Sequence, residues 1–126
     1  MKRVFFSVVL IILAISICIF SSVSTVKKSE EMKNELEETG LLITDGKTTE
    51  ALKRLDEAEK IWKKTENLFS FLVDADKIEE LNVGFSMIKA HLKDKNKEHA
   101  LERLRECELL LEEIAENEKL DIKNIM

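Results

Sequence analysis

Residues 4–26 form one run without a charged side chain, VFFSVVLIILAISICIFSSVSTV, in a chain of which 36% of the residues are charged. At about 1.5 Å per residue, a helix of this length exceeds the ~30 Å hydrocarbon core of a bilayer. A domain made from residues 27–126 is too small to bury a helix that is apolar on every side. We therefore expect residues 1–26 to form a transmembrane anchor. The side chains expected inside the bilayer include Val4, Phe5, Leu10, Ile12, Ile15 and Phe20.

The same region also has features of a cleaved signal peptide, because Lys2 and Arg3 precede the apolar run. Ser22 and Ser24 would supply the small residues before a cut after Ser24. The apolar run is longer than the ~7–15 residues usual in a signal peptide, and no Ala-x-Ala site is present, which favours an uncleaved anchor. With cleavage, the product would instead be a secreted helical domain that binds a ligand or acts as an enzyme.

Charge predicts the orientation and excludes one class of partner. Lys2, Arg3 and the amino terminus favour a cytoplasmic N-terminus, and long domains cross the membrane largely regardless of their own charge. We therefore expect a single-pass protein of the cell membrane with residues 27–126 on the extracytoplasmic side. This domain has 18 Lys and Arg against 25 Asp and Glu, a net charge of −7. Because an acidic surface does not neutralise phosphates, nucleic acid is not an expected partner.

The part of the chain after residue 26 is typical of helices, since it has no proline and only three glycines. Its apolar positions recur every three or four residues in four stretches, which places one apolar stripe along each of four helices. The stripes are Met32, Leu36, Thr39 and Ile43; Leu52, Leu55, Ala58, Trp62, Thr65, Phe69 and Leu72; Ile78, Leu81, Phe85, Ile88 and Leu92; and Leu101, Leu104, Cys107, Leu111 and Ile114. The predicted fold is all-α: a transmembrane helix followed by a small antiparallel bundle of about four helices, built as two hairpins.

Signals for helix ends lie between the stripes. Gly46 follows the first stripe, and Thr48 is a candidate cap for the second helix. Asp76, three residues before a glutamate, has the form of a capping box for the third helix, and Asn96 is a candidate cap for the fourth. Residues 51–59 (ALKRLDEAE) match residues 100–108 (ALERLRECE) at six of nine positions. Two similar helical hairpins would explain this match, and so would chance similarity between helices of the same biased composition.

No combination of residues in the sequence points to catalysis or to a bound cofactor or metal. His91 and His99 do not lie in a metal-binding motif. Residues 74–76 (DAD) resemble the start of a calcium loop, but its sixth position is Glu79 where glycine is required, and its twelfth is Phe85 where glutamate is required. We expect Cys107 to be a buried, unreactive thiol. Gly84, in the middle of the third predicted helix, either admits close approach of a neighbouring helix or of a bulky ring such as Trp62, or is simply tolerated there. The chain is therefore predicted not to be an enzyme and to need no cofactor.

The expected role is a membrane-tethered interaction module that binds lipid and another membrane or envelope protein, or a second copy of itself. Trp62, Phe69 and Phe71 are the candidate partner contacts, because aromatic residues at positions 69 and 71 of a helix cannot both face one core. A third alternative is a regulatory subunit of a larger membrane protein. For that role, Ser7, Ala14 and Ser21 would form a small-residue face in the membrane.

Several segments resemble the family of the domain of unknown function 4363. They are Trp62, residues 70–78 (SFLVDADKI), residues 85–88 (FSMI), residues 100–114 and the end of the chain from 120 to 126. The resemblance implies a small helical membrane-associated protein of spore-forming Gram-positive bacteria with no assigned activity. Family members tend to have Asp-His-x-Glu-Ile where this chain has residues 74–78 (DADKI), so the turn lacks a histidine and a glutamate that could have formed a site.

Overall fold

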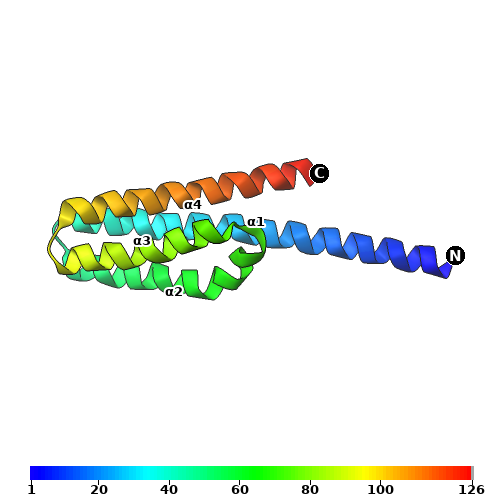
Figure 1. The fold of residues 1–126 in the computed structure, drawn as a ribbon, viewed down its shortest axis with the longest axis horizontal. Helices are drawn as coiled ribbons and strands as arrows, with labels where there is room; N and C mark the ends of the chain where they lie inside the picture. The colour runs from blue at the N-terminus through cyan, green and yellow to red at the C-terminus, as the bar shows by residue number, and fades with distance from the viewer. Residues whose placement is uncertain (126) are drawn as a thin grey trace.

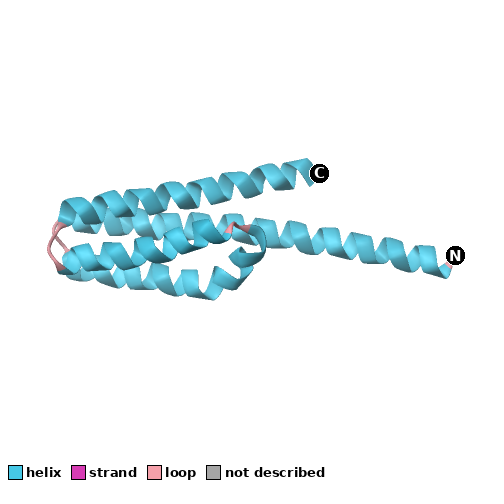
Figure 2. Cartoon of the chain, in the orientation of Figure 1, coloured by secondary structure: helices cyan, strands magenta, loops and turns pink. Residues whose placement is uncertain are grey.

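Four α-helices make up the regular structure of residues 1–125. The computed structural model describes the backbone of these residues and all of their side chains except those of Phe71 and Ile125. The helices are α1 (Lys2–Thr44), α2 (Thr48–Leu72), α3 (Ala75–Lys93) and α4 (Lys97–Ile125). Figure 2 shows only short turns between them, which confirms the all-α prediction and the number of helices.

The helices form an antiparallel bundle in which each one packs against two others. α1 contacts α2 and α4, and α3 completes the ring by contacting the same two helices. The α1–α2 and α3–α4 turns lie at one end of the bundle, and the α2–α3 turn lies at the other end (Figure 1). The C-terminal end of α4 passes that second end, and the N-terminal part of α1 projects much farther on the same side, where no other helix accompanies it (Figure 1). We call the end with the α2–α3 turn the proximal end.

Helix α1 runs through two different environments without a break. By length and composition it is a candidate membrane span, and none of its apolar window is buried. The six side chains predicted to lie in the bilayer are between 45% and 74% exposed. Burial begins at Ser22 and Thr25, ahead of the boundary expected at residue 26, and continues to Ile43. The bundle therefore begins inside the uncharged run, and no linker separates the two parts.

The predicted stripes form the core. Its largest fully buried side chains include Met32 and Leu36 on α1, Phe85 on α3 and Leu111 on α4. On α2, Trp62 and Phe69 are 1% and 0% exposed, and their rings pack edge to face with centroids 5.3 Å apart. The residues at the ends of three stripes, Leu52, Leu72, Ile78 and Leu101, are only partly buried.

The two hairpins have equivalent turns at a shift of 49 residues, in agreement with the hairpin explanation of the sequence match. Gly46 after α1 and Lys95 after α3 occupy equivalent positions, and both have positive φ angles, +79° and +60°. Directly after them, the amides of Lys47 and Asn96 donate to carbonyls five residues back, at 2.9 and 2.8 Å. Each turn therefore satisfies the end of its helix in the same way.

The predicted helix caps were only partly right. Asn96 caps α4, because its side-chain oxygen accepts a hydrogen bond from the amide of His99 at 3.3 Å. Thr48 is already the first residue of α2 and caps nothing. The capping box at Asp76 is also wrong: Ala75, a good helix former, starts α3 one residue earlier, and the carbonyl of Asp74 accepts the first helical hydrogen bonds.

Candidate functional site

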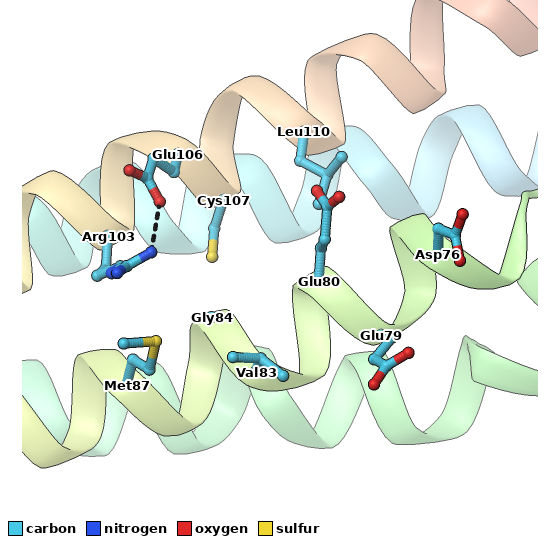
Figure 3. Close-up of a pocket in the computed structure, with 10 residues that line it drawn as sticks. All are labelled: Asp76, Glu79, Glu80, Val83, Gly84, Met87, Arg103, Glu106, Cys107 and Leu110. Carbon is cyan, nitrogen blue, oxygen red and sulfur yellow. Dashed lines mark hydrogen bonds and ion pairs between the residues drawn. The ribbon is translucent and has the colours of Figure 1, made fainter.

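A groove of about 530 Å³ runs between α3 and α4 on the surface of the bundle (Figure 3). Its floor is formed by Gly84 and Cys107, where α3 and α4 are in tight contact. Val83, Met87 and Leu110 add apolar surface beside the floor. We take this groove as the candidate site, because its apolar floor lies beside charged side chains.

The close approach depends on the absence of a side chain at Gly84. A Cβ atom built on this glycine would overlap the Sγ atom of Cys107, which points toward it in Figure 3. Of the alternatives expected for Gly84, this supports close approach of a neighbouring helix, although the neighbour is α4 and not the ring of Trp62. Burial, with a smaller contribution from the charge of Glu106, raises the pKa of the Cys107 thiol to about 11. The thiol is therefore protonated, and a poor nucleophile, at neutral pH.

The proximal end of the groove is acidic. Asp76, Glu79 and Glu80 line it, and none of the three makes an ion pair in the part of the chain that the structure describes. The one cation among the lining residues, Arg103, lies farther along α4 and pairs with Glu106 at 3.0 Å (Figure 3). The carboxylates at the proximal end are thus not neutralised by the groove itself.

The outward face of α3 next to the groove carries no charge. Asn82, Val83, Ser86 and Ala90 are exposed along it, with Val83 49% exposed. The outward faces of the other bundle helices are rich in Lys and Glu. The sequence contains a signal for this surface, because residues 81–88 are the longest run without a charge after residue 26.

Two of the three predicted partner contacts, Trp62 and Phe69, are not on this surface. Trp62 and Phe69 are core residues, so their predicted role as exposed contacts needs correction: in the closed bundle they stabilise the fold and a partner does not reach them. The Trp62 indole donates a hydrogen bond to the side-chain oxygen of Asn82, which joins α2 to α3. The side chain of Phe71 lies outside what the structure describes.

The two histidines come together, which the sequence did not indicate. The rings of His91 and His99 lie 5.4 Å apart at the α3–α4 turn, and the side-chain oxygen of Asn96 is 2.9 Å from Nδ1 of His99. No group of three or more His, Cys, Asp and Glu side chains that could hold a metal ion is present among residues that the structure describes.

A second polar location is the interior of the proximal end. Glu118 on α4 is only 4% exposed, and Ser22 on α1, which is also buried, is one of its neighbours. Burial raises the pKa of Glu118, while a hydrogen bond with the Ser22 side chain lowers it by a smaller amount. Glu108, buried farther along α4, also has a raised pKa because of burial, opposed by its hydrogen bond from Arg105 at 3.1 Å.

Of three comparisons with known proteins, one gives a match. No curated protein and no solved structure matches the chain. The model of one family, described as a domain of unknown function, matches residues 19–125, which include the whole bundle and the end of the projecting segment. The resemblance seen in the sequence is thus confirmed, and the chain belongs to the DUF4363 family.

Proposed function

We propose that this protein is a non-enzymatic interaction or accessory module, held at the extracytoplasmic face of the cell membrane by the first part of α1. The observation that carries the proposal is the change of environment along one unbroken helix. Residues 4–20 contain thirteen Val, Leu, Ile and Phe side chains and are exposed, whereas the same helix is buried in the bundle from Ser22 to Ile43. At about −0.4 kcal/mol each, those thirteen residues favour insertion into a bilayer by roughly 5 kcal/mol.

The packing of Ser22 supports retention of the anchor. A cut after Ser24 would remove Ser22, which hydrogen-bonds the buried carboxyl group of Glu118. Loss of a partner from a buried carboxyl group is costly, because the group keeps its desolvation penalty. Cleavage would therefore weaken the proximal end of the domain that it releases.

The character of the groove supports binding in preference to catalysis. Its thiol, Cys107, is protonated at neutral pH, and no histidine is among its lining residues to act as a base for it. An uncharged helix face beside an apolar groove is instead typical of surfaces that bind another protein.

The location is tested by labelling a single cysteine in intact cells. In a chain with Cys18→Ser and Cys107→Ser, a reporter cysteine replaces Glu98 at the far end of the bundle, and a matched chain carries it at Lys2. A membrane-impermeant maleimide is expected to label Glu98→Cys in intact cells and Lys2→Cys only after lysis. Labelling in the reverse order would refute the orientation, and a product in the medium without its first 24 residues would establish the secreted alternative.

The interaction role is tested with a photo-cross-linking amino acid placed, one at a time, at exposed positions on all four bundle helices in cells. A discrete adduct at one position and none at the others is expected. If no position gives an adduct, the interaction role is wrong.

A further inference from the structure

The uncharged face of α3 is shaped for another helix. Val83, Ser86 and Ala90 are small and follow one another at intervals of three and four residues, so they lie on one side of α3. Small side chains allow a second helix axis to approach to about 8 Å. From Asp76 to Met87 the groove extends over twelve residues of α3, a rise of about 16 Å, which is three turns of a helix lying along it.

The charges at the proximal end define the chemistry of that helix. Asp76 is in the first turn of α3, where the helix dipole favours an acid, but Glu79 and Glu80 lie beyond that turn. Their charges lie next to the apolar part of the groove, and no cation among the described residues pairs with them. The nearest lysine in sequence, Lys77, pairs instead with Glu113 on α4, at 3.2 Å. A helix with Lys or Arg at this end would neutralise the acidic residues.

A second copy of the chain does not fit this surface. Two copies anchored in one bilayer by the same segment stand parallel, with their acidic ends at the same height. A symmetric contact through the groove would place Asp76, Glu79 and Glu80 of one copy opposite the same residues of the other. Like charges in such an arrangement repel one another and disfavour the symmetric contact.

We infer that the α3–α4 groove binds a helix of a different membrane protein, one that carries Lys or Arg in its membrane-proximal turns and small apolar residues above them. The inference rests on the proposed function, because the tether is what holds both partners at one height above the bilayer. It goes further by naming the surface and the chemistry of the partner.

The test uses the full chain in nanodiscs of phosphatidylcholine, whose net charge of zero does not attract a basic peptide. The probe is a fluorescent, capped helical peptide of about 18 residues with Lys in its first two turns and Ala and Leu in the rest. A matched peptide has Glu in place of each Lys, and empty nanodiscs give the background. Binding is measured by fluorescence anisotropy.

Two pairs of variants separate the groove from general electrostatics. Glu79→Lys with Glu80→Lys reverses the acidic end, and Glu98→Lys with Glu102→Lys makes the same change in net charge at exposed positions of α4 outside the groove. Val83→Gln changes the apolar face, and Leu109→Gln is its control, since both residues are 49% exposed. Circular dichroism verifies that each variant keeps its helices.

The Lys peptide is expected to bind at least about tenfold more tightly than the Glu peptide. The double change at Glu79 and Glu80 should weaken its binding by about tenfold, and Val83→Gln by about threefold, while each control changes it less than about twofold. Absence of binding, equal binding of the two peptides, or equal effects in the control variants would overturn the inference. If cross-links in cells then arise on another face, the proposed function still stands without this groove.

Discussion

Replacing Gly84 with alanine places a methyl group at the tight contact of α3 and α4, where the Sγ atom of Cys107 already fills the space. Two effects of this substitution oppose each other. Alanine in the middle of a helix is about 1 kcal/mol more favourable than glycine. Overpacking of a tight contact typically costs about 1–3 kcal/mol. The sulfur can move only by rotation about χ1, so we expect the clash to dominate and the free energy of unfolding to fall by about 1 kcal/mol.

The sign of the effect should reverse when the sulfur is removed. Cys107→Ala alone leaves a small void in a buried position and should cost about 1–2 kcal/mol. In that background the methyl group of Gly84→Ala enters the vacated space and gains the helix propensity, so it should stabilise the bundle by about 1 kcal/mol. The coupling between the two positions is then about 2 kcal/mol, as expected for residues in direct contact.

The assay is urea unfolding of the full-length chain in detergent micelles, followed by the fluorescence of Trp62, the only tryptophan, which is buried in the bundle. Ser86→Ala on the exposed face of α3 is the control and should have the same small effect in both backgrounds. If Gly84→Ala stabilises the protein equally with and without Cys107, the two side chains do not compete for space, and this account of the helix contact is wrong.

Three further predictions concern buried side chains. Trp62→Ala should lower the free energy of unfolding by about 3–5 kcal/mol, because it removes the largest core side chain. Circular dichroism measures this change, and a loss below about 1 kcal/mol would contradict the place of Trp62 in the core. In a Cys18→Ser chain at pH 8, the rate of alkylation of Cys107 by iodoacetamide should not exceed the rate at which urea unfolds the bundle, since burial raises the pKa of this thiol to about 11. Rapid alkylation of the folded protein would refute this. The raised pKa of Glu118 means that the folded chain binds this proton more tightly than the unfolded chain, so stability decreases as pH rises from the ordinary glutamate value through the raised one. Glu118→Gln should therefore be more stable than the natural chain at pH 7 and lose that advantage below pH 4. The control Glu116→Gln, at an exposed position, should not stabilise the protein in this way. A Glu118→Gln chain that is less stable than the natural one at pH 7 would contradict the reasoning.

The helices and most of the core were predictable because one physical signal determines both. An apolar side chain every three or four residues needs a partner surface, and four such stripes with short turns leave little choice but an antiparallel bundle. Met32, Leu36, Phe85 and Leu111 were all identified by this spacing and are all buried. The equivalent turns at Gly46 and Lys95 also agree with a visible sequence match.

The candidate site was less predictable, because spacing does not say which side of a helix is covered. Trp62 and Phe69 belong to the core, although large aromatic side chains are also typical of interfaces. The groove depends on how closely α3 and α4 approach, and this distance depends on the pairing of Gly84 with Cys107, two residues far apart in sequence. The sequence signal for the groove is the absence of charged residues from 81 to 88. In a sequence, such a run indicates core residues, but in the fold one of its members, Val83, is half exposed.

Because α1 has no break, its projecting segment and the bundle are rigidly joined. From Val26 to Thr44 the helix rises about 27 Å, and it enters the bundle with no hinge at which motion could be absorbed. An inclination of about 20°, ordinary for a single span, would carry the far turns sideways by about 9 Å. If the first part of α1 spans the bilayer as proposed, thinning or thickening of the surrounding lipid would thus be transmitted directly to the position of the whole bundle above the membrane surface.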